Sequence, residues 1–188
     1  MGLHTVTREL LQTMVAAQKA SNTLLRIRLV GDSGVEIKSE EGNAYAQLQG
    51  NADRESNLDI VQHLSNVFGK YGILSEEGNY GLGNPSAVDY FTVDSLNGTR
   101  DFLDGSDDYS SEQALVNEGL PSLGVIAYPS KSTVFFRDIF GQTYSSYLDV
   151  QNTGNIFARA ERVYPSSCSD LKDARLLISR HNLGEFDL

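Results

Sequence analysis

The chain of 188 residues has no tryptophan, one cysteine and four prolines. A lone Cys168 excludes an intramolecular disulfide, and it favours a reducing compartment, so we expect a cytoplasmic protein with an inert thiol at this position. Lys and Arg total 15 against 25 Asp and Glu, and the net charge of −10 disfavours nucleic acid polymers and anionic membranes as partners. No run approaches the ~20 apolar residues of a membrane span, and the mixed N-terminus lacks the apolar stretch of a signal peptide.

What is present has the composition of an ordinary globular protein, with 40% hydrophobic and 21% charged residues, and the length suits one domain over residues 1–188. Apolar residues recur every three or four positions near the N-terminus, with no intervening Gly or Pro, and predict an amphipathic helix over residues 3–22. The apolar runs 24–30 and 35–38 flank the turn signal Gly-Asp-Ser-Gly and predict a β-hairpin.

A second helix is predicted to begin at Asp53, whose carboxylate can accept backbone N–H bonds at a helix start, and to end at Gly69. Short β-rich segments follow, separated by turn residues, at 73–75, 90–93, 113–116, 122–128, 133–136, 143–147 and 175–179. Two helices followed by a run of strands favour an α+β fold, in which the helices pack on a largely antiparallel sheet.

Acidic residues stand at the ends of three predicted elements: Asp53 opens the second helix, Glu76 and Glu77 follow one strand, and Asp94 follows another. Carboxylates at strand ends can converge on one rim of a sheet, and hard cations such as Mg²⁺ prefer oxygen ligands. The loop after Asp94 also contains Gly98, which lets backbone amides approach an anion. Taken singly, the three pieces are also typical of a helix cap, a solvated pair and a plain turn.

The order of these pieces resembles the inositol monophosphatase superfamily. Segment 90–102, YFTVDSLNGTRDF, is similar to the motif in which an apolar strand leads into Asp-Pro-(Ile/Leu)-Asp-Gly-Thr. Segment 72–77, GILSEE, resembles the family's metal-binding Glu-Glu segment, and segment 46–53, AQLQGNAD, resembles its Thr-x-Ala-Asp helix start. Segments 114–126 and 178–181 are most similar to the 3′(2′),5′-bisphosphate nucleotidases of the sulfate-assimilation type.

The resemblance implies a Mg²⁺ site. Glu76 and Asp94 would ligate one Mg²⁺, with the backbone carbonyl of Leu96 as a further oxygen ligand. Asn97 stands where the family has the Asp that links the metals. Because Asn offers a neutral oxygen in place of a bridging carboxylate, we expect weaker occupancy of at least one metal.

The same resemblance implies hydrolysis of a phosphomonoester without a covalent intermediate. Glu76 and Thr99 would orient the attacking water, and Asp53 would hold the water shell of a further metal and assist as a base. The backbone amides of Gly98 and Thr99 would hold the substrate phosphate.

The chain also departs from the family pattern. Ser95 replaces the Pro of the motif and removes a φ constraint, and segment 48–50 replaces the Pro-Val-Thr that usually precedes the Asp at position 53. Family members continue into a second α/β domain with a Trp-Asp metal motif, whereas this chain ends at Leu188 and has no Trp. We therefore expect an N-terminal metal and phosphate domain without its C-terminal partner, an exposed apolar sheet face, and a possible homodimer that covers it.

Three functions stay open from the sequence. The first is a phosphatase acting on 3′-phosphoadenosine 5′-phosphate or a related small phosphorylated metabolite, with inositol monophosphate as the alternative substrate. The second is a non-catalytic module that keeps the fold and some metal affinity, which Asn97 and the short chain favour. The third is a structural or interaction domain unrelated to phosphate, which the ordered motif matches disfavour.

Overall fold

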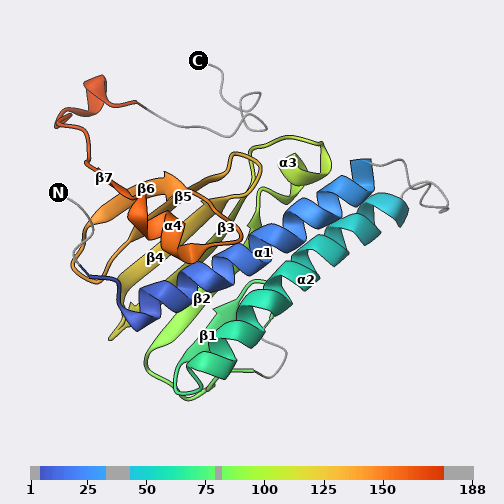
Figure 1. Ribbon diagram of the computed structural model, residues 1–188, viewed down its shortest axis with the longest axis horizontal. Coiled ribbons are helices and arrows are strands. Elements are labelled where there is room, and N and C mark those ends of the chain that lie inside the picture. Colours follow the sequence, from blue (N-terminus) through green and yellow to red (C-terminus); the bar gives the residue numbers. More distant parts are fainter. Residues whose placement is uncertain (1–4, 33–42, 79–81, 176–188) are drawn as a thin grey trace.

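The computed structural model describes residues 5–32, 43–78 and 82–175. Two long helices, α1 (Arg8–Asp32) and α2 (Asn43–Val67), lie side by side and cover one face of a seven-stranded sheet (Figure 1). The predicted α+β fold, with two N-terminal helices on a largely antiparallel sheet, is therefore confirmed. None of the described helices is long and apolar enough to cross a membrane.

The sheet follows chain order from its first strand to its last. Its strands are β1 (Gly72–Ser75), β2 (Tyr90–Asn97), β3 (Ser110–Asn117), β4 (Leu120–Tyr128), β5 (Thr133–Arg137), β6 (Thr143–Tyr147) and β7 (Glu161–Val163). Only β1 and β2 pair in parallel, and the other neighbours pair antiparallel. All six strand segments predicted between residues 73 and 147 lie in these strands. Segment 175–179 lies outside the described residues, apart from Arg175, which is in no strand.

Three short elements complete the described chain. These are α3 (Thr99–Leu103) after β2, α4 (Thr153–Ala158) between β6 and β7, and a 3₁₀ turn at Leu171–Asp173. The sequence patterns did not predict α4, the 3₁₀ turn or β7, because each is too short to show a period. α4 is held by its cap, in which the side chain of Asn152 accepts a hydrogen bond from the backbone N–H of Asn155.

Helix α1 begins after Thr7, whose hydroxyl accepts the backbone N–H of Leu10 at 3.2 Å. The strand predicted over 24–30 is wrong, because α1 continues to Asp32. Leu24 is fully buried and Ile27 is 6% exposed, so they extend the buried stripe of α1 at helical spacing. The second arm of the predicted hairpin, 35–38, lies outside the described residues.

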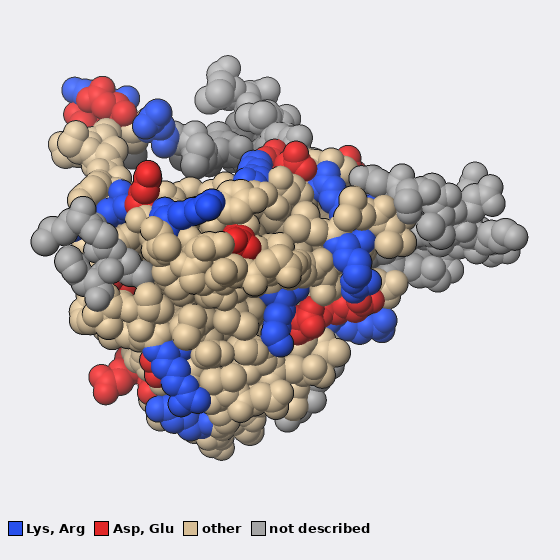
Figure 2. All heavy atoms as spheres, viewed as in Figure 1, with Lys and Arg blue, Asp and Glu red and all other residues tan. Residues whose placement is uncertain are grey.

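Helix α2 begins at Asn43, so the prediction that Asp53 caps its start is wrong. The preceding residues are rich in Ala and Gln, which favour the helix, and they carry it past this position toward the N-terminus. The predicted end of the helix before Gly69 is confirmed. Figure 2 shows the molecule from the side of the two helices, where acidic and basic side chains are interspersed among uncharged ones.

The main core lies between the two helices and the sheet. It joins the buried stripes of α1 and α2 to the inward-facing residues of the central strands, for example Leu115, Val125 and Phe136. A smaller cluster under the far end of α1 contains Leu24, Ile27, Ala52, Leu96, Phe102 and Tyr109. This second cluster holds the end of β2 and the short α3 against both helices.

The other face of the sheet is apolar and open. Leu74 is 63% exposed, Tyr147 is 53% exposed, and Ile126 and Phe135 are 37% and 36% exposed. These residues alternate with the buried ones along their strands, as side chains on opposite faces of a sheet must. A hollow of about 490 Å³ lies on this face, and its lining includes Leu74, Ile126 and Phe135. The exposed apolar face expected from the sequence is therefore present among the described residues.

We expect this face to bind an uncharged hydrophobic dye such as Nile red with a strong rise in fluorescence, because large exposed apolar side chains line its hollow. Phe135→Ser and Ile126→Ser should each lower the signal. The control is Val88→Ser, which removes a side chain that is 76% exposed but lies outside the hollow. A monomer with no dye signal would be inconsistent with this expectation, whereas a dimer in light scattering would indicate that a second copy covers the face.

Candidate functional site

The predicted site residues gather where α2, β1 and β2 meet. The backbone N–H of Glu76 donates to the carbonyl of Val93 at 3.2 Å, so the turn after β1 runs beside the end of β2. The hydroxyl of Ser95 donates to the backbone carbonyl of Asp53 at 3.1 Å, which ties β2 to the middle of α2. The structure therefore brings Asp53, Glu76 and the acidic end of β2 to one rim of the sheet, as predicted.

Asn57 fixes the turn that carries Glu76 and Glu77. Its amide donates to the carbonyl of Gly78 at 2.8 Å, and its side-chain oxygen accepts the hydroxyl of Ser75 at 2.6 Å. Asn57 is fully buried, and it lies one helical turn after Asp53 on the same face of α2. Sequence reasoning missed this residue, although its spacing from an acidic candidate was a usable signal.

The segment after Asp94 folds into a compact turn at a β-bulge, because the pairing of β2 with β3 shifts between Asp94 and Asn97. The backbone N–H of Leu96 donates to Oδ1 of Asp94 at 3.2 Å. The hydroxyl of Thr99 donates to the carbonyl of Leu96 at 3.2 Å. This carbonyl is the oxygen that the family resemblance assigns to a metal. Asn97 is exposed at the end of β2, and its amide donates to Oε1 of Glu112 at 2.7 Å.

Gly98 is required by the backbone at this point. Its φ of 86° lies in the left-handed region, and a Cβ here would come within 2.9 Å of the carbonyl oxygen of Asp108. Its own carbonyl accepts the backbone N–H of Phe102 at 2.9 Å and so opens α3. The turn between β2 and α3 therefore packs directly against the loop that precedes β3.

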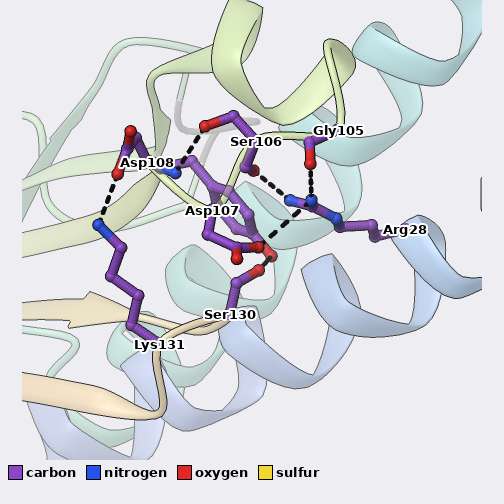
Figure 3. A network of polar contacts seen from close by, with 8 residues as sticks. Arg28, Gly105, Ser106, Asp107, Asp108, Ser130 and Lys131 are labelled. Atoms are coloured by element: carbon purple, nitrogen blue, oxygen red, sulfur yellow. Dashed lines mark hydrogen bonds and ion pairs between the residues drawn. The ribbon is translucent and has the colours of Figure 1, made fainter.

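Arg28, near the end of α1, holds that preceding loop in place (Figure 3). Its guanidinium donates to the carbonyls of Gly105 and Ser106, lies 3.3 Å from a carboxylate oxygen of Asp107, and sits over the ring of Tyr109 at 5.4 Å. Its side chain is only 15% exposed. Helix α1 is thus connected to the candidate site through a loop that sequence reasoning did not consider.

The negative charges of the carboxylates in the site repel one another. Burial and, after it, the charges of Glu77, Glu76 and Asp94 together raise the pKa of Asp53 from 3.8 to about 7. Burial and the charges of Glu76 and Glu112 likewise raise the pKa of Asp94 to about 6. None of the ion pairs of the described residues involves these carboxylates. Among the described residues these carboxylates therefore have no ion-pair partner, although Arg137 also lines the hollow that Glu76 and Asp94 line.

The donor set of this rim suits a hard divalent cation, since it consists of carboxylate and carbonyl oxygens. Within the described ranges, no group of three or more His, Cys, Asp or Glu side chains lies close enough together to hold a metal ion by itself. Mg²⁺ does not need such a group, because it keeps several waters and takes one or two carboxylates together with substrate phosphate. The residues present therefore fit Mg²⁺, with Asp94 and Glu76 as the nearest candidates to hold it.

Family comparisons agree with these motifs. The model of the "Inositol monophosphatase family" matches residues 7–182. The Nus factor SuhB of Xylella fastidiosa is 35% identical over 121 residues, which are 64% of this chain and 41% of that protein. The putative Nus factor SuhB of Neisseria meningitidis serogroup A is 25% identical over 122 residues, which are 64% of this chain and 44% of that protein. The chain thus spans less than half the length of these curated relatives.

Solved structures show the same fold. CysQ from Bacteroides thetaiotaomicron, a bacterial member of the inositol monophosphatase family, superposes with a TM-score of 0.64 at 24% identity over 85% of this chain and 58% of its own. The extragenic suppressor protein SuhB from Bartonella henselae has a TM-score of 0.60 at 25% identity, over 74% of this chain and 51% of its own. Because the family model covers the sequence almost from end to end, the chain belongs to the inositol monophosphatase family.

Proposed function

We propose that this chain is the metal- and phosphate-handling domain, spanning residues 1–188, of a cytoplasmic Mg²⁺-dependent phosphomonoesterase. The observation that carries the proposal is the rim of carboxylates that have no ion-pair partner among the described residues, in which the pKa of Asp53 is about 7 and that of Asp94 is about 6. When bound, Mg²⁺ offsets this charge and polarises the phosphate of the substrate. Family membership supports a phosphatase-type role.

The role proposed for each side chain follows from its position in the site. Asp94 and Glu76 would hold the cation from two neighbouring elements, and Asp53, which lies close enough to feel their charges from α2, would accept a proton from water. The hydroxyl of Thr99 donates a hydrogen bond to the carbonyl of Leu96, so its lone pairs are left to accept a hydrogen bond from that water and orient it.

Substrate phosphate is proposed to lie on the backbone amides of Gly98 and Thr99. The left-handed backbone of Gly98 supports this, because successive backbone amides in such a turn can form a concavity that binds an anion. We propose a small phosphorylated metabolite of the 3′-phosphoadenosine 5′-phosphate type as substrate, which the similarity of segment 114–126 to nucleotidases supports, with inositol monophosphate as the alternative.

A second candidate is a non-catalytic module that retains metal and phosphate binding. Asn97 favours it, because it removes one carboxylate from the family motif. The curated relatives also bear the name Nus factor rather than the name of an enzyme. Measurement of turnover separates the two candidates.

We expect Mg²⁺-dependent release of phosphate from 3′-phosphoadenosine 5′-phosphate, faster than from inositol 1-phosphate and abolished by a chelator. Asp94→Asn should lower the rate by two orders of magnitude or more, roughly the loss seen when one group that stabilises transition-state charge is removed. Asn97→Asp should raise the affinity for Mg²⁺, because it restores the carboxylate of the family motif. Colorimetric phosphate release, measured across a Mg²⁺ titration, tests all three points.

The matched control is Asp89→Asn. Asp89 lies just before the start of β2, at the opposite end from the site, and its Oδ1 accepts the backbone N–H of Glu118. This variant should leave the rate unchanged. Full activity of Asp94→Asn would refute the assigned site. A folded protein that releases no phosphate at saturating Mg²⁺, either as wild type or as Asn97→Asp, would favour the non-catalytic module.

A further inference from the structure

Glu112 occupies a position in the site that the motif does not include. It lies on β3 directly opposite Asp94, with which it forms a Cα pair in the antiparallel register. Its neighbours Ser111 and Gln113 are buried against the helices, so the side chain of Glu112 points to the other face, where it lines the hollow together with Asp94 and Glu76. Glu112 therefore shares the rim with both candidate metal ligands.

One oxygen of this carboxylate is fixed and the other is available. Oε1 accepts the amide of Asn97 at 2.7 Å and the hydroxyl of Ser110 at 2.9 Å. In the described part of the chain, no hydrogen bond reaches Oε2 of Glu112, and no Lys or Arg is paired with it. The two donors hold the carboxylate in one orientation, as partners of a metal-ligating group do.

The uncharged amide of Asn97 suits a position beside the carboxylate of Glu112. Their side chains are in hydrogen-bond contact, so a carboxylate at position 97 would stand beside the carboxylate of Glu112 and the two would repel. With an amide at 97, the pair carries one negative charge in place of two. The charge that the loop lacks at the end of β2 is thus present one strand away.

We propose that Glu112 is a further metal-ligating carboxylate of this site, supplying from β3 the negative charge that Asn97 does not supply from β2. The proposal rests on the proposed function, because it needs a divalent cation at the rim. If Glu112 is a ligand, the loop of residues 94–99 supplies only part of the ligand set, and β3 supplies the rest.

Glu112→Gln tests the charge without removing the contacts. The amide oxygen of Gln can still accept from Asn97 and Ser110, so the fold should be kept and the negative charge alone is lost. The double variant Asn97→Asp with Glu112→Gln moves the carboxylate back to the loop. The control is Glu118→Gln, an exposed residue in the turn between β3 and β4. Isothermal titration with MgCl₂, on protein whose thermal unfolding has been checked, gives Kd for each variant.

We expect Glu112→Gln to weaken Mg²⁺ binding by roughly 10- to 100-fold, the scale on which groups around a metal affect its affinity. The double variant should regain most of the wild-type affinity, and Glu118→Gln should match the wild type. Equal affinity of Glu112→Gln and the wild type would overturn the role of Glu112 and leave the proposed function standing. A wild type that binds no Mg²⁺ would overturn both, and a double variant as weak as Glu112→Gln would overturn the exchange of charge between the two strands.

Discussion

In the presence of a chelator, raising the pH from about 5.5 to about 8 is expected to lower the free energy of unfolding by about 2 kcal/mol. The cause is the raised pKa of Asp53, about 7, and of Asp94, about 6, against 3.8 for an ordinary Asp. A raised pKa means that the folded chain holds protons which the unfolded chain releases. The resulting stability is fully present below pH 3.8 and is lost as the pH rises through 6 and 7. Urea unfolding across this range measures it.

Two comparisons isolate the effect. Asp53→Asn carries no titrating proton, so its stability should change much less across the same pH range. His63 acts in the opposite direction, because burial lowers its pKa and stability is lost when it becomes charged at lower pH. Addition of Mg²⁺ at pH 8 should restore stability to the wild type, since a ligand that binds only the folded state stabilises it. A wild type whose stability rises steadily from pH 5.5 to 8 in chelator would contradict the proposed burial of these carboxylates.

The strands were predictable because each combines a local pattern with a turn signal. The turn Asn117-Glu118-Gly119 joins β3 to β4, and both Glu118 and Gly119 have positive φ, which is the backbone that such a two-strand connection needs. Alternating residues of β4 and β5 face the helices and the open face in turn, as their sequence indicates. The contacts of a hairpin join residues that are close in the sequence, so the sequence alone contains most of the information needed to predict these strands and their turns.

The helix boundaries were less predictable because tertiary contacts decide them. Segment 24–30 alternates apolar residues with Arg26 and Arg28 and so satisfies a strand pattern as well as a helix pattern. Whether this segment forms a helix or a strand depends on α2 and on the cluster around Tyr109, which bury Leu24 at helical spacing. Likewise, Asp53 has the chemistry of a cap, but the residues before it continue the helix.

The site residues that belong to the sequence motif could be predicted. The residues that reach the site only through contacts between elements could not. Glu76 follows β1 and Asp94 lies in β2, and the parallel pairing of these two strands brings them together. Glu112 reaches the site through the register of β3, and Asn57 reaches it through one turn of α2. The register of β3 cannot be read from the sequence, whereas the spacing of Asn57 from Asp53 in the predicted helix could have been used.

Replacing Arg28 is expected to have the second large effect. Arg28→Met should lower the free energy of unfolding by about 2 to 3 kcal/mol, because it removes two hydrogen bonds from a charged donor and leaves the carbonyls of Gly105 and Ser106 without it. The loop that these carbonyls belong to packs so closely against Gly98 that a Cβ there would lie 2.9 Å from the carbonyl oxygen of Asp108. We therefore also expect faster proteolytic cleavage within residues 104–109, measured by mass spectrometry alongside urea unfolding.

Arg26→Met is the matched control, since it removes the same charge and length from the same helix. Arg26 forms an ion pair with Glu55 at 2.6 Å, but the two side chains are 59% and 44% exposed. An ion pair in water contributes about 1 kcal/mol or less, so this variant should unfold almost as the wild type does. Equal stability of the two variants would mean that the loop does not depend on α1. A large difference confined to Arg28→Met would instead connect the end of α1 to the turn that carries Gly98, and so to the proposed phosphate position.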